Sequence, residues 1–247
     1  MLKYEYQFYD DLSDTSLPSA RRILPMLLEI IDIKSAIDFG CGDGSWLSVL
    51  CELGVDEIKG IDGDWVDISQ LKIPIDCFQR AAIERSIDLS RTFDLAISLE
   101  VAEHLPPIRA ESFIKELCTA APLVLFSAAI PHQGGVNHIN EQWPAYWASI
   151  FAGYGYQCAD ILRMRVWDDP EVTWWYKQNL LLFARAELTQ SNSKLKQLFK
   201  DCAPAALVHP EKYEEIARRS RPSLGRWIKS APAAFRNSLF KRFNKAE

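Results

Sequence analysis

The chain has 247 residues, of which 48% are hydrophobic, enough for one α/β domain with appendages. Its six cysteines form no Cys-x-x-Cys pair, which excludes a disulfide framework and a cysteine-rich zinc site. The net charge is −5, yet residues 190–247 hold 13 Lys and Arg against 5 Asp and Glu, so we predict an acidic body and a basic tail.

The N-terminal residues 1–34 are predicted to form a helical cover. Ser19 is placed to cap a helix that runs to Ile31, with apolar residues at helical spacing between them. This region lacks the basic and apolar stretches of a signal peptide, and no apolar run of the chain is long enough to span a bilayer. We therefore expect a cytoplasmic protein.

A glycine-rich turn follows the first predicted strand. Ala36, Ile37 and Phe39 supply the apolar residues of this strand, and Gly40-Cys41-Gly42-Asp43-Gly44 comes next, before a helix that begins near Ser45. Glycines at alternate positions permit φ > 0 and leave no Cβ in the way of a ligand. The N-terminus of the helix directs free N–H groups at the same place. This arrangement predicts a nucleotide-like ligand at the edge of a sheet.

Strands and helices alternate through residues 35–189, which indicates a doubly wound, mostly parallel α/β sheet. Helices are expected between most strands, for example at 45–53 and 109–120. Residues 190–247 are predicted to be a basic C-terminal helical extension, with helices at 191–201 and 211–220. The seven strands are expected near 35–39, 57–61, 75–79, 93–99, 122–127, 156–163 and 178–185.

Three segments of the chain resemble the class I S-adenosylmethionine-dependent methyltransferases. They are residues 38–44, residues 60–62, and residues 93–105 with Glu103-His104-Leu105 at their end. The resemblance implies a Rossmann-like fold whose last two strands form an antiparallel edge, and S-adenosylmethionine as cofactor. The implied cofactor-binding residues are Asp38, Gly40, Cys41, Gly42 and Gly44 at the methionine end, Asp62 at the ribose hydroxyls, Gly63, and Glu100 where cofactor and substrate meet.

The position that often recognises the adenine amino group departs from the family pattern. Many members carry an acidic residue there, whereas this chain has Ala82-Ile83. The backbone of Ala82 and the side chain of Gln79 are the two alternatives for that contact.

Ligand-type residues gather after the fourth strand. If a helical turn begins near Glu100, then Glu100, Glu103 and His104 share one face, because they are three and four residues apart. With His138 as a fourth ligand, or His132 in its place, they would hold Mg²⁺ or Mn²⁺. In the alternative without a metal, His104 or His138 is a general base, or His104 is a structural hydrogen-bond partner.

The Glu-x-x-Glu-His element resembles the metal site of small-RNA 3′-terminal 2′-O-methyltransferases. It also resembles ubiquinone-pathway O-methyltransferases. Residues 138–147 and 174–179 resemble bacterial methyltransferases from glycan and secondary-metabolite gene clusters. Their aromatic and amide side chains predict a pocket for a sugar or another ring, while the alternative for each aromatic residue is a place in the core. The predicted substrate-contacting residues are Tyr9, His132, Asn137, Trp143, Tyr146, Trp175 and Tyr176.

Together these features predict O-methylation of a hydroxylated small molecule or a saccharide, either with or without the help of a divalent metal ion. A first alternative is an RNA 3′-terminal 2′-O-methyltransferase, against which the acidic body argues, because phosphate binding requires a continuous basic groove. A second is a non-catalytic cofactor-binding module that recruits a partner through its tail. The aromatic and basic residues 226–243 either lie on an anionic membrane or protein surface or pack on their own domain.

Overall fold

The computed structural model describes the backbone of residues 2–200 and 203–220, and the side chains of residues 15–200 and 203–218. The chain divides into two compact units, Met1–His209 and Pro210–Glu247. Helix α9 (Pro210–Ser220) belongs to the second unit. The predicted surface element at residues 226–243 lies outside the described residues. Within the described part of the chain, every helix is too short or too polar to cross a bilayer.

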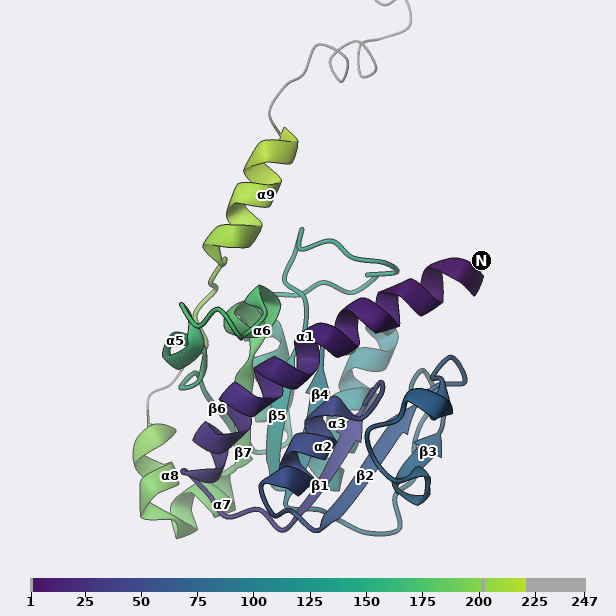
Figure 1. The fold of residues 1–247 in the computed structure, drawn as a ribbon. Coiled ribbons are helices and arrows are strands. Elements are labelled where there is room, and N and C mark those ends of the chain that lie inside the picture. The colour runs from purple at the N-terminus through teal and green to yellow at the C-terminus, as the bar shows by residue number, and fades with distance from the viewer. Residues whose placement is uncertain (1, 201–202, 221–247) are drawn as a thin grey trace, which may run out of the picture. The chain divides into compact units, whose positions relative to one another are not determined.

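The first unit is built on a seven-stranded sheet with the order β3-β2-β1-β4-β5-β7-β6, counted over the described residues (Figure 1). The neighbours from β3 to β5 are parallel, and β7 is antiparallel to both β5 and β6. This confirms the predicted doubly wound sheet and its antiparallel edge. The strands are β1 (Ser35–Phe39), β2 (Glu57–Asp62), β3 (Phe78–Arg80), β4 (Leu95–Leu99), β5 (Leu123–Ser127), β6 (Tyr156–Ala159) and β7 (Leu181–Arg185).

The strand order reverses direction at β1, which pairs with β2 on one side and β4 on the other. The register places Asp38 beside Gly60 of β2 and Ile97 of β4. In open parallel sheets, ligands bind outside the carboxyl ends of the strands at such a switch point. The glycine-rich turn and the residues after β4 both lie at this edge.

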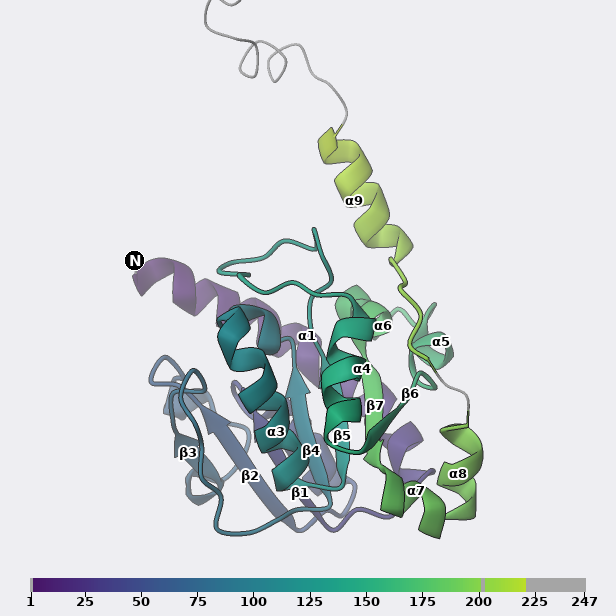
Figure 2. The same cartoon turned by 180° about the vertical axis from the view of Figure 1, so that it is seen from behind.

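Helices cover both faces of the sheet. Helices α1 (Leu2–Leu28) and α2 (Ser45–Glu52) lie over the face seen in Figure 1, and α3 (Ala110–Ala120) and α4 (Pro144–Gly153) cover the opposite face in Figure 2. Alternate residues of a strand point to opposite faces, so β1 contributes Ala36 to one core and Ile37 and Phe39 to the other. Both faces are therefore buried, as the continuous apolar runs of the strands predict.

The structure corrects the predicted start of the N-terminal helix. Helix α1 begins at Leu2, and Ser19 lies inside it with no exposed surface. The Ser19 hydroxyl donates to the carbonyl of Thr15 at 2.8 Å and accepts from the amide of Thr173 at 3.0 Å. Serine inside a helix can bond to the preceding turn in this way. The helix ends at Leu28 rather than at Ile31.

Several other boundaries also differ from the prediction. Strand β3 begins three residues later because Ile75–Cys77 forms a 3-10 turn after Pro74. Residues 178 and 179, at the start of the last strand predicted at 178–185, belong to helix α6 (Trp174–Asn179). The helix expected at 191–201 is divided at Asn192, whose side chain accepts from the amides of Lys194 and Leu195. The remaining helices are α5 (Arg163–Val166), α7 (Ala186–Ser191) and α8 (Ser193–Leu198).

Residues 190–209 pack with the sheet rather than with the following unit. Leu195 and Phe199 are buried in the same apolar core as α1 and α2. The compact unit therefore extends to His209, twenty residues beyond the boundary at 189 that the charge asymmetry suggests.

Candidate active site

The glycine-rich turn adopts the conformation that its sequence predicts. Gly40, Gly42 and Gly44 have φ values of 84°, 54° and 80°, in the left-handed region that favours glycine. At Gly40 space is also limiting, because a Cβ atom there would overlap Cγ2 of Val101 and lie 3.2 Å from its Cγ1. Val101 directly follows Glu100, so the turn lies against the segment that carries the ligand-type residues.

Asp62 holds this turn in place. Its Oδ2 accepts from the Gly42 amide and its Oδ1 from the Gly63 amide, both at 2.7 Å. Burial raises the pKa of Asp62, and the two hydrogen bonds partly oppose that increase. Each carboxylate oxygen keeps further lone-pair capacity for a ligand hydroxyl. The Trp65 ring lies over Gly63, where a Cβ atom would overlap it.

A second carboxylate, Asp38, lies at the end of β1 and is 2% exposed. Burial raises the pKa of Asp38 well above its usual range, and the charges of Asp62 and Asp43 add to the increase. The same environment raises the pKa of the Cys41 thiol. Burial disfavours the charged form of these carboxylates, and a cationic ligand at the switch point would favour their ionisation.

The predicted adenine contact lies beside this group. The amide of Ala81 donates to the Asp62 carbonyl at 2.8 Å, which brings Ala82 next to the end of β2. Ile83 is buried in the core, whereas Ala82 is exposed and Gln79 is half-buried. Both alternatives for the adenine contact therefore stay open to a ligand.

Glu100 does not share a face with Glu103 and His104, which corrects the predicted helical turn. The turn is the 3-10 helix η3 (Ala102–His104), and Glu100 precedes it with a left-handed φ of 55°. The Glu100 carboxylate accepts from Gln133 Nε2 at 3.0 Å and from Asn179 Nδ2 at 3.0 and 3.1 Å. Two buried amide side chains thus donate hydrogen bonds to the carboxylate that was expected to bind a metal.

These amides form a network that the sequence only partly revealed. Gln178 is fully buried and donates to the side-chain oxygens of Gln133 at 3.0 Å and Asn179 at 3.1 Å. Its own oxygen accepts from the His209 amide at 2.9 Å. Gln178 was not singled out from the sequence. Two adjacent amides directly before an apolar strand were the available signal, since buried polar groups need partners.

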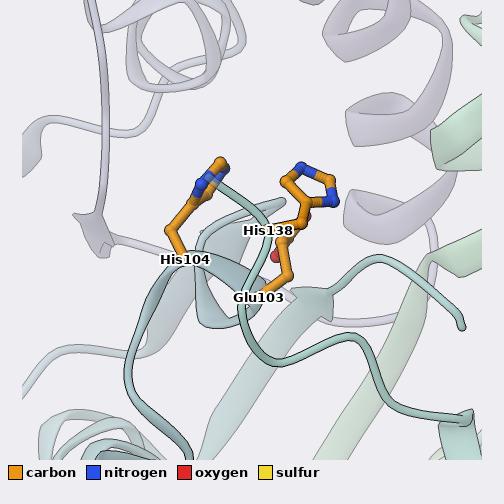
Figure 3. Close-up of side chains that lie close together, drawn as sticks. All are labelled: Glu103, His104 and His138. Atoms are coloured by element: carbon orange, nitrogen blue, oxygen red, sulfur yellow. The ribbon is translucent and has the colours of Figure 1, made fainter. Parts of the chain in front are cut away.

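Three of the predicted catalytic residues do come together: Glu103, His104 and His138 (Figure 3). Each offers a donor atom, and these atoms all lie within 4.8 Å of one another. Glu103 is fully buried, and neither of its carboxylate oxygens has a hydrogen-bond partner among the described residues. Burial raises the pKa of Glu103 well above its usual range, and the nearby charge of Glu100 adds to this.

The two imidazoles lie close to each other. Their ring centroids are 4.8 Å apart and their planes are nearly perpendicular, at 89°. Burial lowers the pKa of His104 to about 4, and the proximity of His138 contributes, so His104 is neutral at physiological pH. A neutral imidazole is the form that ligates a metal or accepts a proton.

His138 lies on the loop between β5 and α4, which covers the carboxyl ends of the strands (Figures 1 and 2). The amides of Ile139 and Asn140 donate to the Glu103 carbonyl at 2.9 and 3.0 Å, which holds the loop against η3. His132, the alternative fourth ligand, is exposed on the same loop and lies outside the three-residue cluster.

The predicted substrate-contacting residues separate into two groups. His132, Asn137 and Trp143 are exposed on the β5–α4 loop, the last of them by 41%. The others lie elsewhere: Tyr146 lines a surface groove between α3 and α4, Trp175 packs against the core, and Tyr176 is buried with its ring 5.2 Å from that of Trp46. The side chain of Tyr9 lies outside the described residues.

Comparison with known proteins agrees with this architecture. A family model described as a methyltransferase domain matches residues 13–159, which is more than half of the chain. The chain therefore belongs to this methyltransferase family, and its fold is that of the class I S-adenosylmethionine-dependent enzymes, as the resemblance predicted.

One curated relative is the ubiquinone biosynthesis O-methyltransferase of Methylobacterium nodulans. It is 31% identical over 117 residues, which are 44% of this chain and 43% of that protein. The matched segment thus spans less than half of the relative's length.

Solved structures share the fold at low sequence identity. An O-methyltransferase family protein from Burkholderia thailandensis superposes with a TM-score of 0.54 at 14% identity, over 73% of this chain and 59% of that chain. The small RNA methyltransferase HEN1 gives 0.50 at 16% identity, over 67% of this chain and 25% of that chain. These identities support a shared fold and leave the acceptor open.

Proposed function

We propose that this chain is an O-methyltransferase that acts on a hydroxylated small molecule or a saccharide. The observation that carries the proposal is the cluster of Glu103, His104 and His138 next to the glycine-rich turn. Glu103 and His104 directly follow Val101, which lies against Gly40, so an acceptor hydroxyl at the cluster would be close to the cofactor site. The names of the Methylobacterium and Burkholderia proteins support oxygen as the methylated atom.

The residues at the switch point fit S-adenosylmethionine. Bound there, the cofactor supplies a methyl group on a cationic sulfonium. Gly42 leaves the turn open, since a Cβ there would meet nothing within 4 Å, and a cationic ligand would favour the ionised forms of Asp38 and Asp62. Asp62 faces the ribose hydroxyls in this proposal. Methyl transfer is then a matter of orienting the acceptor and removing its proton.

The cluster also fits a divalent metal ion. A buried carboxylate that has no hydrogen-bond partner among the described residues and two close imidazoles form the donor set, with Glu103, His104 and His138 as the ligands. A metal bound there would lower the pKa of the acceptor hydroxyl. Two imidazoles and one carboxylate suit Mn²⁺ better than Mg²⁺, since imidazole favours the softer ion.

Without a metal, the proton of the acceptor would go to one of the two histidines. A pKa of about 4 makes His104 a weak base at neutral pH. His138 is therefore the better candidate for the general base. Turnover that persists in excess chelator would support this version of the mechanism and reject the metal-assisted one.

The first experiment is calorimetric titration of S-adenosylhomocysteine into the full chain, followed by titration of Mn²⁺. We expect binding of both, with Mn²⁺ binding at least about tenfold weaker in Glu103→Gln and His138→Gln. His132→Gln is the matched control, since His132 is on the same loop outside the cluster, and it should retain Mn²⁺ affinity.

A panel of polyols, catechols and sugars with radiolabelled S-adenosylmethionine then tests the acceptor class. Methylation of a hydroxyl in this panel supports the proposal. Failure of S-adenosylhomocysteine to bind would overturn the cofactor assignment, and methylation confined to amines would overturn O-methylation.

A further inference from the structure

A single carboxylate organises the loop that carries His138. Glu141 accepts from the His132 amide at 2.7 Å through Oε2 and from the Gly134 amide at 2.6 Å through Oε1. It also contacts His138 Nδ1 through Oε1 at 3.1 Å. The Glu141 side chain is 18% exposed, so solvent screens these bonds only in part.

The loop needs such a partner because its backbone is irregular. His132, Gly134 and Asn137 have left-handed φ values of 70°, 68° and 60°. Changes of backbone direction at these positions prevent a repeating pattern of main-chain hydrogen bonds. Glu141 replaces two of those bonds with its own oxygens, and one of these oxygens, Oε1, also contacts the histidine ring.

The contact with Glu141 determines which nitrogen of His138 carries the proton. An ionised carboxylate has no proton to donate, so Nδ1 must be the donor in this hydrogen bond. The neutral ring then has its lone pair on Nε2. The hydrogen bond of one ring nitrogen thus selects the role of the other.

Gly135 provides the space in which the ring lies. A Cβ atom on Gly135 would overlap Nε2 and lie 2.7 Å from Cδ2 of His138. The φ of Gly135 is outside the left-handed region, unlike that of Gly134. The site therefore requires glycine at position 135 because glycine has no side chain, and not because the backbone conformation there is unusual.

We propose that Glu141 is a positioning residue of the active site, which holds His138 as the Nδ1–H tautomer against Gly135. The inference rests on the proposed function in one respect, namely that His138 acts on the acceptor or on its metal. Loss of a carboxylate partner of this kind weakens activity or metal affinity by about 10- to 100-fold.

The direct test is the tautomeric state of His138 in the full chain labelled with ¹⁵N-histidine. Long-range ¹H–¹⁵N spectra distinguish protonated from unprotonated ring nitrogens, and His138→Gln identifies the signals of His138. We expect Nδ1–H in the wild type, loss of that preference in Glu141→Ala, and partial retention in Glu141→Gln, which keeps one acceptor oxygen. An Nε2–H tautomer in the wild type, or an unchanged tautomer in Glu141→Ala, would overturn the proposal.

Glu111→Ala is the matched control, because Glu111 is a carboxylate on α3 whose side chain contacts Tyr154 at 3.5 Å. It should leave the His138 signals unchanged. The spectrum needs neither acceptor nor metal, so it tests the proposal even if the proposed function fails. Titration of S-adenosylhomocysteine into the same variants reports separately on the cofactor site, which Glu141 does not contact.

A second variant keeps the proposal testable if Glu141→Ala does not fold. Gly135→Ala should displace the ring and weaken Mn²⁺ binding or methyl transfer about tenfold or more, with unchanged affinity for S-adenosylhomocysteine. Gly153→Ala, at a position where a Cβ meets nothing within 4 Å, should leave both unaffected. Wild-type behaviour of Gly135→Ala and of Glu141→Gln in every readout would reject the proposal.

Discussion

Gly40 and Gly54 share a left-handed backbone but differ in what surrounds them. Their φ values are 84° and 90°, yet a Cβ on Gly40 would overlap Val101, whereas a Cβ on Gly54 meets nothing within 4 Å. We expect Gly54→Ala to lower the free energy of unfolding by about 1 kcal/mol through backbone strain. Gly40→Ala should lower it by about 2–4 kcal/mol, because overpacking adds to the strain.

Chemical denaturation of both variants measures this difference. A third variant, Gly40→Ala combined with Val101→Ala, should recover part of the loss by removing the overlapping methyl groups. Equal destabilisation by the two single substitutions would show that steric overlap at the turn has no effect.

Asp38 is predicted to decrease the stability of the ligand-free protein at neutral pH. Its pKa in the folded state is well above that of the unfolded chain, chiefly because of burial. Protonated Asp38 therefore gives its full contribution to stability at pH values below the pKa of the unfolded chain. That contribution is lost as the pH rises through the pKa of the folded state. Asp38→Asn should raise the free energy of unfolding at pH 7 by about 1–2 kcal/mol and flatten its decline with pH.

Thermal unfolding between pH 4 and pH 8 checks this prediction, with Asp56→Asn at an exposed position as control. The same Asp38→Asn substitution should weaken S-adenosylhomocysteine binding. A variant that is less stable than the wild type at pH 7 would contradict the assignment of Asp38 as a destabilising buried charge.

At the scale of single residues, the sequence predicted those residues whose role follows from their immediate neighbours in the chain. Glycines in a turn, an acid at a strand end and the adjacent Glu103 and His104 are visible in short stretches. Gln178 and Glu141 are different, because their roles depend on partners on other elements or across an irregular loop. Side-chain partners of this kind arise from tertiary packing, which spacing in the sequence does not encode.

The buried hydroxyl of Ser19 on α1 hydrogen-bonds to Thr173, the residue that precedes α6. Ser19 accepts the Thr173 amide at 3.0 Å and its Oγ lies 3.2 Å from the Thr173 hydroxyl. Ser19→Ala would leave a backbone amide without this partner, so we expect a loss of about 1–3 kcal/mol in the free energy of unfolding.

Ser48→Ala is the comparison, because the Ser48 hydroxyl bonds only to the Ser45 carbonyl of its own helix in the described contacts. It should be neutral or slightly stabilising, since alanine is the better helix former. If Ser19→Ala unfolds at the same denaturant concentration as Ser48→Ala, the connection between α1 and Thr173 does not depend on this hydroxyl.

Element boundaries show where sequence reasoning reached its limit. Hydrophobic periodicity located the central strands β1, β4 and β5 best, because burial on both faces produces apolar runs. It misplaced the ends of β3 and β7, since a 3-10 turn and helix α6 use residues that also fit a strand. Ser19 was misread as a cap because serine is favoured at helix N-termini, whereas its buried bond to the Thr173 amide depends on a residue far away in the sequence.

For the whole molecule, the division between the two compact units gives a further prediction. Every strand among the described residues, and the candidate site, belong to Met1–His209. A chain ending at His209 should fold cooperatively and bind S-adenosylhomocysteine with unchanged affinity. Calorimetry and thermal unfolding of the shortened and full chains test this, and a loss of binding would mean that the second unit contributes to the site.

The overall architecture was predictable because alternating strands and helices leave few topologies. The doubly wound sheet follows from that alternation, and the position of the ligand site follows from the switch at β1. The placement of the loop after β5 does not follow from either rule. It depends on main-chain bonds from Ile139 and Asn140 to Glu103, which join segments more than thirty residues apart.

The left-handed backbone of Glu100 has an evolutionary consequence. A non-glycine residue at φ 55° stores about 1–2 kcal/mol of strain, and glycine at this position would release it. Glycine would also remove the carboxylate that Gln133 and Asn179 surround. Removal of the carboxylate would leave the buried amides of Gln133 and Asn179 without this acceptor, at a cost of about 1–3 kcal/mol. The amide network therefore offsets the strain and itself favours a carboxylate at position 100, so we expect glycine there only together with changes at Gln133 and Asn179.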